Sequence, residues 1–131
     1  MEEKTITAEE RKTLLRAQQG ELDAVLMYNA LAKAARSQTD ADTFRTLAAE
    51  EGRHAAVFRA RTGETLRPGK TKAIFLPLLY RTLGRRRVLP LIAQGEYKAA
   101  KRYESVAARF PEVESVKNDE QRHGDMVNAL L

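Results

Sequence analysis

The sequence predicts an all-α protein, a four-helix bundle built from two antiparallel helical hairpins. Residues that favour helices dominate the 131-residue chain, whereas only 7 Gly and 4 Pro occur in it. Apolar residues also recur at the spacing of one helical face in four separate stretches. With 43% hydrophobic residues, a chain of this length is expected to form a single domain over residues 1–131.

The first two helices are expected to form one hairpin. Thr7, with Glu10 three residues later, is a capping box that marks the start of a helix. Where the pattern breaks, Thr39 or Asp40 is expected to cap the second helix, which ends near Gly63. A short turn between two helices predicts that they are antiparallel. The apolar positions are Leu14, Ala17, Ala24, Tyr28, Leu31 and Ala35 in the first helix, then Phe44, Leu47, Ala48, Ala55 and Phe58 in the second.

The last two helices are expected to form the second hairpin. Pro111 falls between them, where the first turn of a helix tolerates proline. The apolar positions are Leu89, Ile92, Ala99, Tyr103, Val106 and Phe110, followed by Val113, Val116, Val127 and Leu130.

Residues 63–87 are too many for a turn and are expected to carry the chain back across the bundle. Residues 72–83 could form a short helix, kinked or begun late because of Pro77. No acidic residue occurs in 65–95, so the net charge of +5 comes from this stretch: 16 basic and 18 acidic residues lie outside it. The basic residues of the stretch are Arg67, Lys70, Lys72, Arg81, Arg85, Arg86 and Arg87.

The chain has no cysteine, which excludes disulfides, thiolate zinc sites, iron–sulfur clusters and a cysteine nucleophile. Any metal ion must therefore be held by carboxylates and imidazoles. The N-terminus is polar, without a signal-peptide pattern, and no apolar run approaches the roughly 20 residues of a membrane span. A cytoplasmic location is expected.

Six ionisable residues interrupt the apolar helix faces. Three residues turn an α-helix by about 300°, so the Glu and His of a Glu-x-x-His pair project from nearly the same face. Buried carboxylates need partners or metal ions, and two divalent cations would balance four of them. One Glu from each of two helices, with Glu-x-x-His from each of the others, is the ligand set of di-iron and di-manganese bundles. The predicted metal ligands are Glu21, Glu51, His54, Glu96, Glu120 and His123, with no further catalytic residue.

The ligand motifs form an internal repeat, which predicts two duplicated hairpins related by a pseudo-twofold axis. Gln19-Gly20-Glu21 with Tyr28 is matched by Gln94-Gly95-Glu96 with Tyr103, and Glu50-Glu51-Gly52-Arg53-His54 is matched by Asp119-Glu120-Gln121-Arg122-His123.

Residues beside the ligands have two interpretations each. Core packing is favoured for Tyr28 and Tyr103, although a phenol two turns from a ligand Glu could donate to a carboxylate. Glu50 and Asp119 could accept the outer N–H of the metal-binding histidines or could be solvated charges. Arg53 and Arg122 could neutralise these acids or face water.

Gly20 and Gly95 occupy matching positions one residue before a predicted ligand Glu. Glycine within a helix is unfavourable, which calls for a structural reason. A close approach of two helices is the expected one.

These motifs resemble the rubrerythrin branch of the ferritin-like superfamily. The signatures are Gly-Glu-x6-Tyr at 20–28 and 95–103, and Glu-x-x-His at 51–54 and 120–123. The resemblance implies a di-iron site that reacts with oxygen or peroxide, with Glu51 and Glu120 bridging the ions. Residues 75–87 look more like the ferritin-like domains fused to membrane proteins of the vacuolar-iron-transporter type.

Two features depart from peroxidase rubrerythrins. These usually carry a further ligand Glu where this chain has Ala99, and they carry a rubredoxin domain with four cysteines.

The leading hypothesis for the function is a di-iron protein that binds Fe(II) and reacts with O2 or H2O2, as a ferroxidase or peroxide scavenger. Two iron ions are the expected cofactor, with Mn or Zn as possible substitutes. The alternative is an iron-binding or delivery module for a membrane iron transporter, with little turnover.

The crossover segment, residues 63–87, also indicates which partners the protein could bind. Phe75, Leu76, Leu78, Leu79 and Leu83 are more apolar than a connection needs. We expect this segment to cover the bundle or to pack against its copy in a homodimer. Docking to a membrane transporter or to anionic lipid is the alternative, and no nucleic-acid partner is expected.

Overall fold

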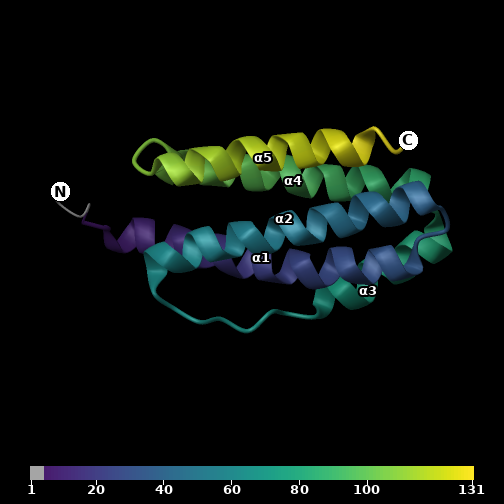
Figure 1. Ribbon diagram of the computed structural model, residues 1–131, viewed down its shortest axis with the longest axis horizontal. Helices are drawn as coiled ribbons and strands as arrows, with labels where there is room; N and C mark the ends of the chain where they lie inside the picture. The colour runs from purple at the N-terminus through teal and green to yellow at the C-terminus, as the bar shows by residue number, and fades with distance from the viewer. Residues whose placement is uncertain (1–4) are drawn as a thin grey trace.

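The computed structural model describes residues 5–131, which form five α-helices and no strand. The short α3 (Thr71–Leu83) lies beside a bundle of four long helices (Figure 1). These are α1 (Ala8–Ala34), α2 (Gln38–Thr62), α4 (Arg85–Ala107) and α5 (Pro111–Asn128). α1 and α2 form one antiparallel hairpin and α4 and α5 the other; α1 meets α4, and α2 meets α5. The all-α prediction is confirmed, and the arrangement is consistent with a ferritin-like helical bundle.

The first two helices each begin at a side-chain cap, and one of the two predicted caps needs correction. The capping box at Thr7 is present, because its hydroxyl accepts from the backbone N of Glu10 at 3.1 Å and the Glu10 carboxylate accepts in return at 3.0 Å. The cap predicted at Thr39 or Asp40 is wrong: Ser37 caps α2 by accepting from the backbone N of Asp40. The Asp40 side chain is instead buried against α3 and α4.

The crossover differs in detail from the prediction. An extended segment, residues 63–70, runs back along the bundle and leads into α3 (Figure 1). α3 begins at Thr71, and Pro77 lies inside it rather than delaying its start. Gly84 alone separates α3 from α4, so the crossover ends before residue 87. Its φ of 92° is a conformation that glycine adopts without strain.

The core has an apolar part at each end of the bundle. Tyr28, Phe44 and Leu89 belong to one part, and Phe58 and Phe110 to the other. Along each long helix, the ionisable residues predicted as ligands fall between these two parts. The apolar clusters therefore enclose a polar layer at mid-height of the bundle.

α3 has a packed face and an open face. Leu76 and Leu79 pack against the core, so α3 covers one side of the bundle, as predicted. The outer face remains uncovered in the single chain, with Phe75 and Leu78 each 54% exposed. Within residues 5–131, no helix combines the length and apolarity required to cross a membrane.

Candidate metal centre

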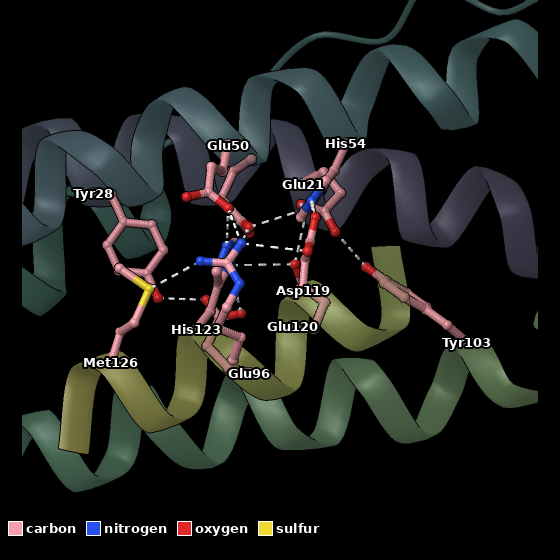
Figure 2. A network of polar contacts seen from close by, with 12 residues as sticks. Glu21, Tyr28, Glu50, His54, Glu96, Tyr103, Asp119, Glu120, His123 and Met126 are labelled. Atoms are coloured by element: carbon pink, nitrogen blue, oxygen red, sulfur yellow. Dashed lines mark hydrogen bonds and ion pairs between the residues drawn. The ribbon is translucent and has the colours of Figure 1, made fainter. Parts of the chain in front are cut away.

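The six predicted ligands meet in the polar layer at the middle of the bundle. Figure 2 labels all of them except Glu51. Each is at most 5% exposed, and all four long helices contribute. α1 provides Glu21, α2 provides Glu51 and His54, α4 provides Glu96, and α5 provides Glu120 and His123. The helical phase read from the sequence therefore placed all six side chains on the inward faces.

His54 turns its Nδ1 atom toward three carboxylates. Glu120 Oε1 is 3.0 Å away, Glu51 Oε1 is 3.3 Å away, and Glu21 Oε2 is 3.5 Å away. These carboxylates come from three different helices, so the imidazole stands where both hairpins meet.

His123 repeats this arrangement from the other hairpin. Its Nδ1 atom lies 2.9 Å from Glu51 Oε1, 3.5 Å from Glu120 Oε1 and 3.6 Å from Glu96 Oε2. The rings of His54 and His123 stack with centroids 5.4 Å apart. Glu51 and Glu120 thus approach both histidines, whereas Glu21 and Glu96 each approach one, which is the pseudo-twofold symmetry expected from the repeat.

The donor set fits metal ions. One ligand atom from each of Glu51, His54, Glu120 and His123 lies within 4.8 Å of the other three. Several buried atoms in the cluster have no hydrogen-bond partner among residues 5–131, namely Glu21 Oε2, Glu51 Oε1, Glu96 Oε2 and His123 Nδ1. Glu51 Oε1 and His123 Nδ1 lie only 2.9 Å apart, yet these two atoms do not form a hydrogen bond with each other. Unsatisfied buried atoms are unfavourable, and cations between them would satisfy them all.

Glu50 and Asp119 hold the outer nitrogens of the histidines. His123 Nε2 donates to Glu50 Oε1 at 3.0 Å, and His54 Nε2 donates to Asp119 Oδ2 at 2.8 Å. Each bond crosses from one hairpin to the other. The interpretation of these acids as partners of the histidines, rather than solvated charges, agrees with the geometry.

The two arginines of the repeat differ. Arg122 donates to Glu50 and lies 3.3 Å from Asp119 Oδ1, so one guanidinium links both outer acids. Arg53 is exposed and forms no ion pair with residues 5–131. Of the two interpretations, neutralisation holds for Arg122 and exposure to water for Arg53.

Both tyrosines pack in the core and also donate hydrogen bonds. Tyr28 donates to Glu96 Oε1, and Tyr103 donates to Glu21 Oε1 at 2.9 Å, so each phenol binds a glutamate of the opposite hairpin. The two rings lie on either side of the cluster (Figure 2). Burial, followed by the nearby glutamate charge, raises the pKa of each phenol, so both stay protonated donors at neutral pH.

Burial and crowding separate the pKa values within the cluster. Burial, and then repulsion from Glu51, raises the pKa of Glu21 to about 8, and burial with repulsion from Glu21 raises that of Glu120. Burial opposes ionisation of Glu51, but the two histidines close to its carboxylate hold its pKa below the ordinary value. Burial also disfavours charged histidine, yet the surrounding carboxylates raise the pKa of His54 and raise that of His123 to about 10. Metal ions would have to displace these protons.

A pocket of about 350 Å³ opens beside the cluster, among residues of α1, α2, α3, α4 and α5. The four glutamates of the cluster, Gly20, Gly95 and Ala99 are among its lining residues. A Cβ atom at Gly20 or Gly95 would contact no other segment of residues 5–131 within 4 Å. The predicted close helix approach is therefore wrong, because these glycines leave open space. The sequence pattern did not predict this pocket, although the glycine repeated before Glu21 and Glu96 was a signal for it.

Fold and cluster together define a helical-bundle protein with a buried Glu/His site suited to two metal ions. The family model described as Rubrerythrin matches residues 12–76, which is just under half of the chain. The matched segment holds Glu21, Glu51 and His54; the second hairpin lies outside it and carries the repeated motifs. No curated protein and no solved structure matched the chain.

Proposed function

We propose that this protein is a non-haem di-iron carboxylate protein that binds Fe(II) and reacts with O2 or H2O2, as a ferroxidase or peroxide-scavenging oxidoreductase. The observation that carries the proposal is the convergence of two histidine Nδ1 atoms on the same two glutamates, Glu51 and Glu120. Mixed carboxylate and imidazole ligands suit iron, with manganese or zinc as substitutes. The rubrerythrin match of residues 12–76 supports the same class of chemistry.

The contacts also support a division of roles among the glutamates. Glu51 and Glu120 each lie within 3.5 Å of both histidine Nδ1 atoms, which favours them as the ligands shared between two ions. Glu21 contacts only His54 Nδ1, and Glu96 only His123 Nδ1, so each would bind a single ion.

Two iron ions would supply the redox chemistry, while the chain positions their ligands. Glu50 and Asp119 accept the Nε2 protons of the histidines, which leaves Nδ1 to face the site. Tyr28 and Tyr103 hold one oxygen each of Glu96 and Glu21, and leave the second oxygen unpartnered and free to bind.

The missing carboxylate at Ala99 favours slow peroxide turnover. Ala99 is buried and lines the pocket beside the cluster, so a longer acidic side chain there would reach the same space. The resemblance to peroxidase rubrerythrins therefore covers the ligand cluster and stops at this position.

The test is metal loading followed by oxidation. Natively expressed protein should contain close to two iron ions per chain, and Fe(II) addition should consume O2 or H2O2. Metal should also raise the melting temperature, since at a hundredfold excess over Kd it stabilises the fold by about 2.7 kcal/mol. Glu120→Ala should lose most binding at both positions, whereas the surface variant Glu64→Ala should bind normally. Melting that ignores both metal and chelator would contradict the proposal.

A second candidate is an iron-binding or delivery module that docks on a membrane transporter. It is favoured by the uncovered apolar face of α3, which lies in the stretch without acidic residues. Such a module would bind two Fe(II) ions and consume little oxidant, so the same titration separates the candidates.

A further inference from the structure

The pocket beside the cluster is long rather than round. Its lining follows α4 from Leu91 to Tyr103, a stretch that rises about 18 Å in an α-helix. Leu91 is 60% exposed and Arg102 is also exposed, so the pocket is open to solvent along this path. An extended molecule fits this shape better than a compact one.

The pocket lining changes in character along its length. One end of the pocket is apolar, because Leu91 and the adjacent Ile92 of α4 line it. Met27, Leu76 and Leu79 are among the other apolar residues of the lining. The carboxylates of the cluster contribute polar oxygens farther along, and Arg102 lies toward the other end of the α4 stretch. An apolar pocket with a few polar groups is typical of small-molecule sites.

Two cations of the pocket have no acidic partner in the described part of the chain. Neither Lys72 nor Arg102 forms an ion pair with residues 5–131, although Arg85, Arg109 and Arg122 all do. An anionic group on a bound molecule would pair with these cations. Because exposed pairs contribute little, the cations would set the orientation of the ligand and its apolar part would supply most of the affinity.

We propose that this pocket binds a free, single-chain aliphatic carboxylate. The chain lies against Met27, Leu76 and Leu79, and the carboxylate pairs with Arg102 or Lys72. A chain in this position passes over Glu21 and Glu96 and closes the open side of the cluster. The inference goes beyond the proposed function, and binding can be measured without any metal ion, so the two proposals can fail separately.

Decanoate titrated into chelator-treated protein and into zinc-loaded protein tests the proposal. Saturable binding of one decanoate per chain is expected in calorimetry with at least one of the two forms. Acetate, which has no chain, and decyltrimethylammonium, which has the opposite charge, should bind much more weakly. Binding of the cation as tight as that of decanoate, or no decanoate binding to either form, would overturn the proposal.

Variants and methyl shifts locate the site. Gly95→Leu fills the pocket and should weaken decanoate binding at least tenfold, whereas Gly52→Leu, a mid-helix glycine outside the pocket, should not. Arg102→Gln should weaken binding about two- to fivefold. In the unaltered protein, methyl signals of Leu76 and Leu79 should shift, and those of the outward Leu78 should not. Shifts confined to Leu78, or equal binding by both glycine variants, would assign decanoate to the outer face of α3 and overturn the proposal.

Discussion

At the scale of single residues, the outer acids Glu50 and Asp119 control how the histidines face the cluster. Each accepts a proton from an Nε2 atom across the two hairpins, which leaves Nδ1 directed at the glutamates. Arg122 links the two acids. Burial favours the protonated form of both acids, but hydrogen bonds from the histidines and from Arg122 hold the pKa of each below its ordinary value.

Glu50→Gln should weaken metal binding although it removes no ligand. Its loss of charge weakens the bond that orients His123 and frees Arg122, and substitutions at such positions typically cost 10–100-fold in metal affinity. Competition titration with a chromophoric zinc chelator measures the effect. Glu64→Gln, which removes a surface acid paired with Arg11, serves as the control. Equal zinc affinity in the two variants would contradict this role for Glu50.

At the scale of elements, the junction of α3 and α4 depends on one buried acid of α2. Asp40 accepts from the hydroxyl of Tyr80 at 2.5 Å and from Arg85 at 2.7 and 3.0 Å. Arg85 also donates to the carbonyl of Leu130 at 2.6 Å, beyond the end of α5. One carboxylate and one guanidinium therefore join the ends of four helices.

Asp40→Asn should destabilise the fold by about 1–2 kcal/mol at neutral pH, the lower part of the range for charged hydrogen bonds because Arg85 is partly exposed. Hydrogen bonding from Arg85 lowers the pKa of folded Asp40 below its ordinary 3.8. The stabilisation that charged Asp40 provides is thus complete at pH values above the pKa of Asp40 in the unfolded chain. It is lost as the pH falls through the lowered pKa of Asp40 in the folded protein.

Urea unfolding at neutral pH and near pH 3 measures this dependence. The difference in unfolding free energy between the Asp40→Asn variant and the unaltered protein should shrink at the lower pH. Asp42→Asn, a change in an exposed acid on the same helix, should alter stability little at either pH. A difference that stays constant with pH would show that the charge of Asp40 is not what holds the junction.

At the scale of the whole molecule, the outer face of α3 is an apolar surface that no other helix of residues 5–131 covers. Ile74, Phe75, Leu78 and Leu83 are at least 50% exposed, within the stretch that lacks acidic residues. Apolar patches of this kind mark interaction sites. The sequence predicts a homodimer, with docking to a membrane transporter or to anionic lipid as the alternative, and nothing in the structure tests either.

We expect a homodimer that resists salt. Contacts between leucines are not screened by ions, so sedimentation velocity should show the dimer at low and high ionic strength, and Phe75→Gln with Leu78→Gln should give a monomer. Anionic liposomes should not pellet the protein. Pelleting that fades as salt rises would instead indicate attraction of Arg86 and Arg87 to lipid headgroups.

The sequence alone determined the helices and the contents of the polar layer. Helical periodicity requires only the order of residues, so it identified the inward faces of the four long helices. The Glu-x-x-His pairs share a face for the same reason, which is why all six predicted ligands are buried together. The capping box at Thr7 and Pro111 in the first turn of α5 are equally local features, and both are confirmed.

Only the tertiary structure decided which residues of different helices touch. Periodicity gives the face of a helix and not the neighbour across it, so the bonds of Tyr28 to Glu96 and of Tyr103 to Glu21 could not be read from spacing. Asp40 was predicted as a cap, but partners 40 and 45 residues away hold its side chain instead. The space beside Gly20 is likewise a product of packing, because a missing side chain becomes a pocket only when no neighbouring helix fills it.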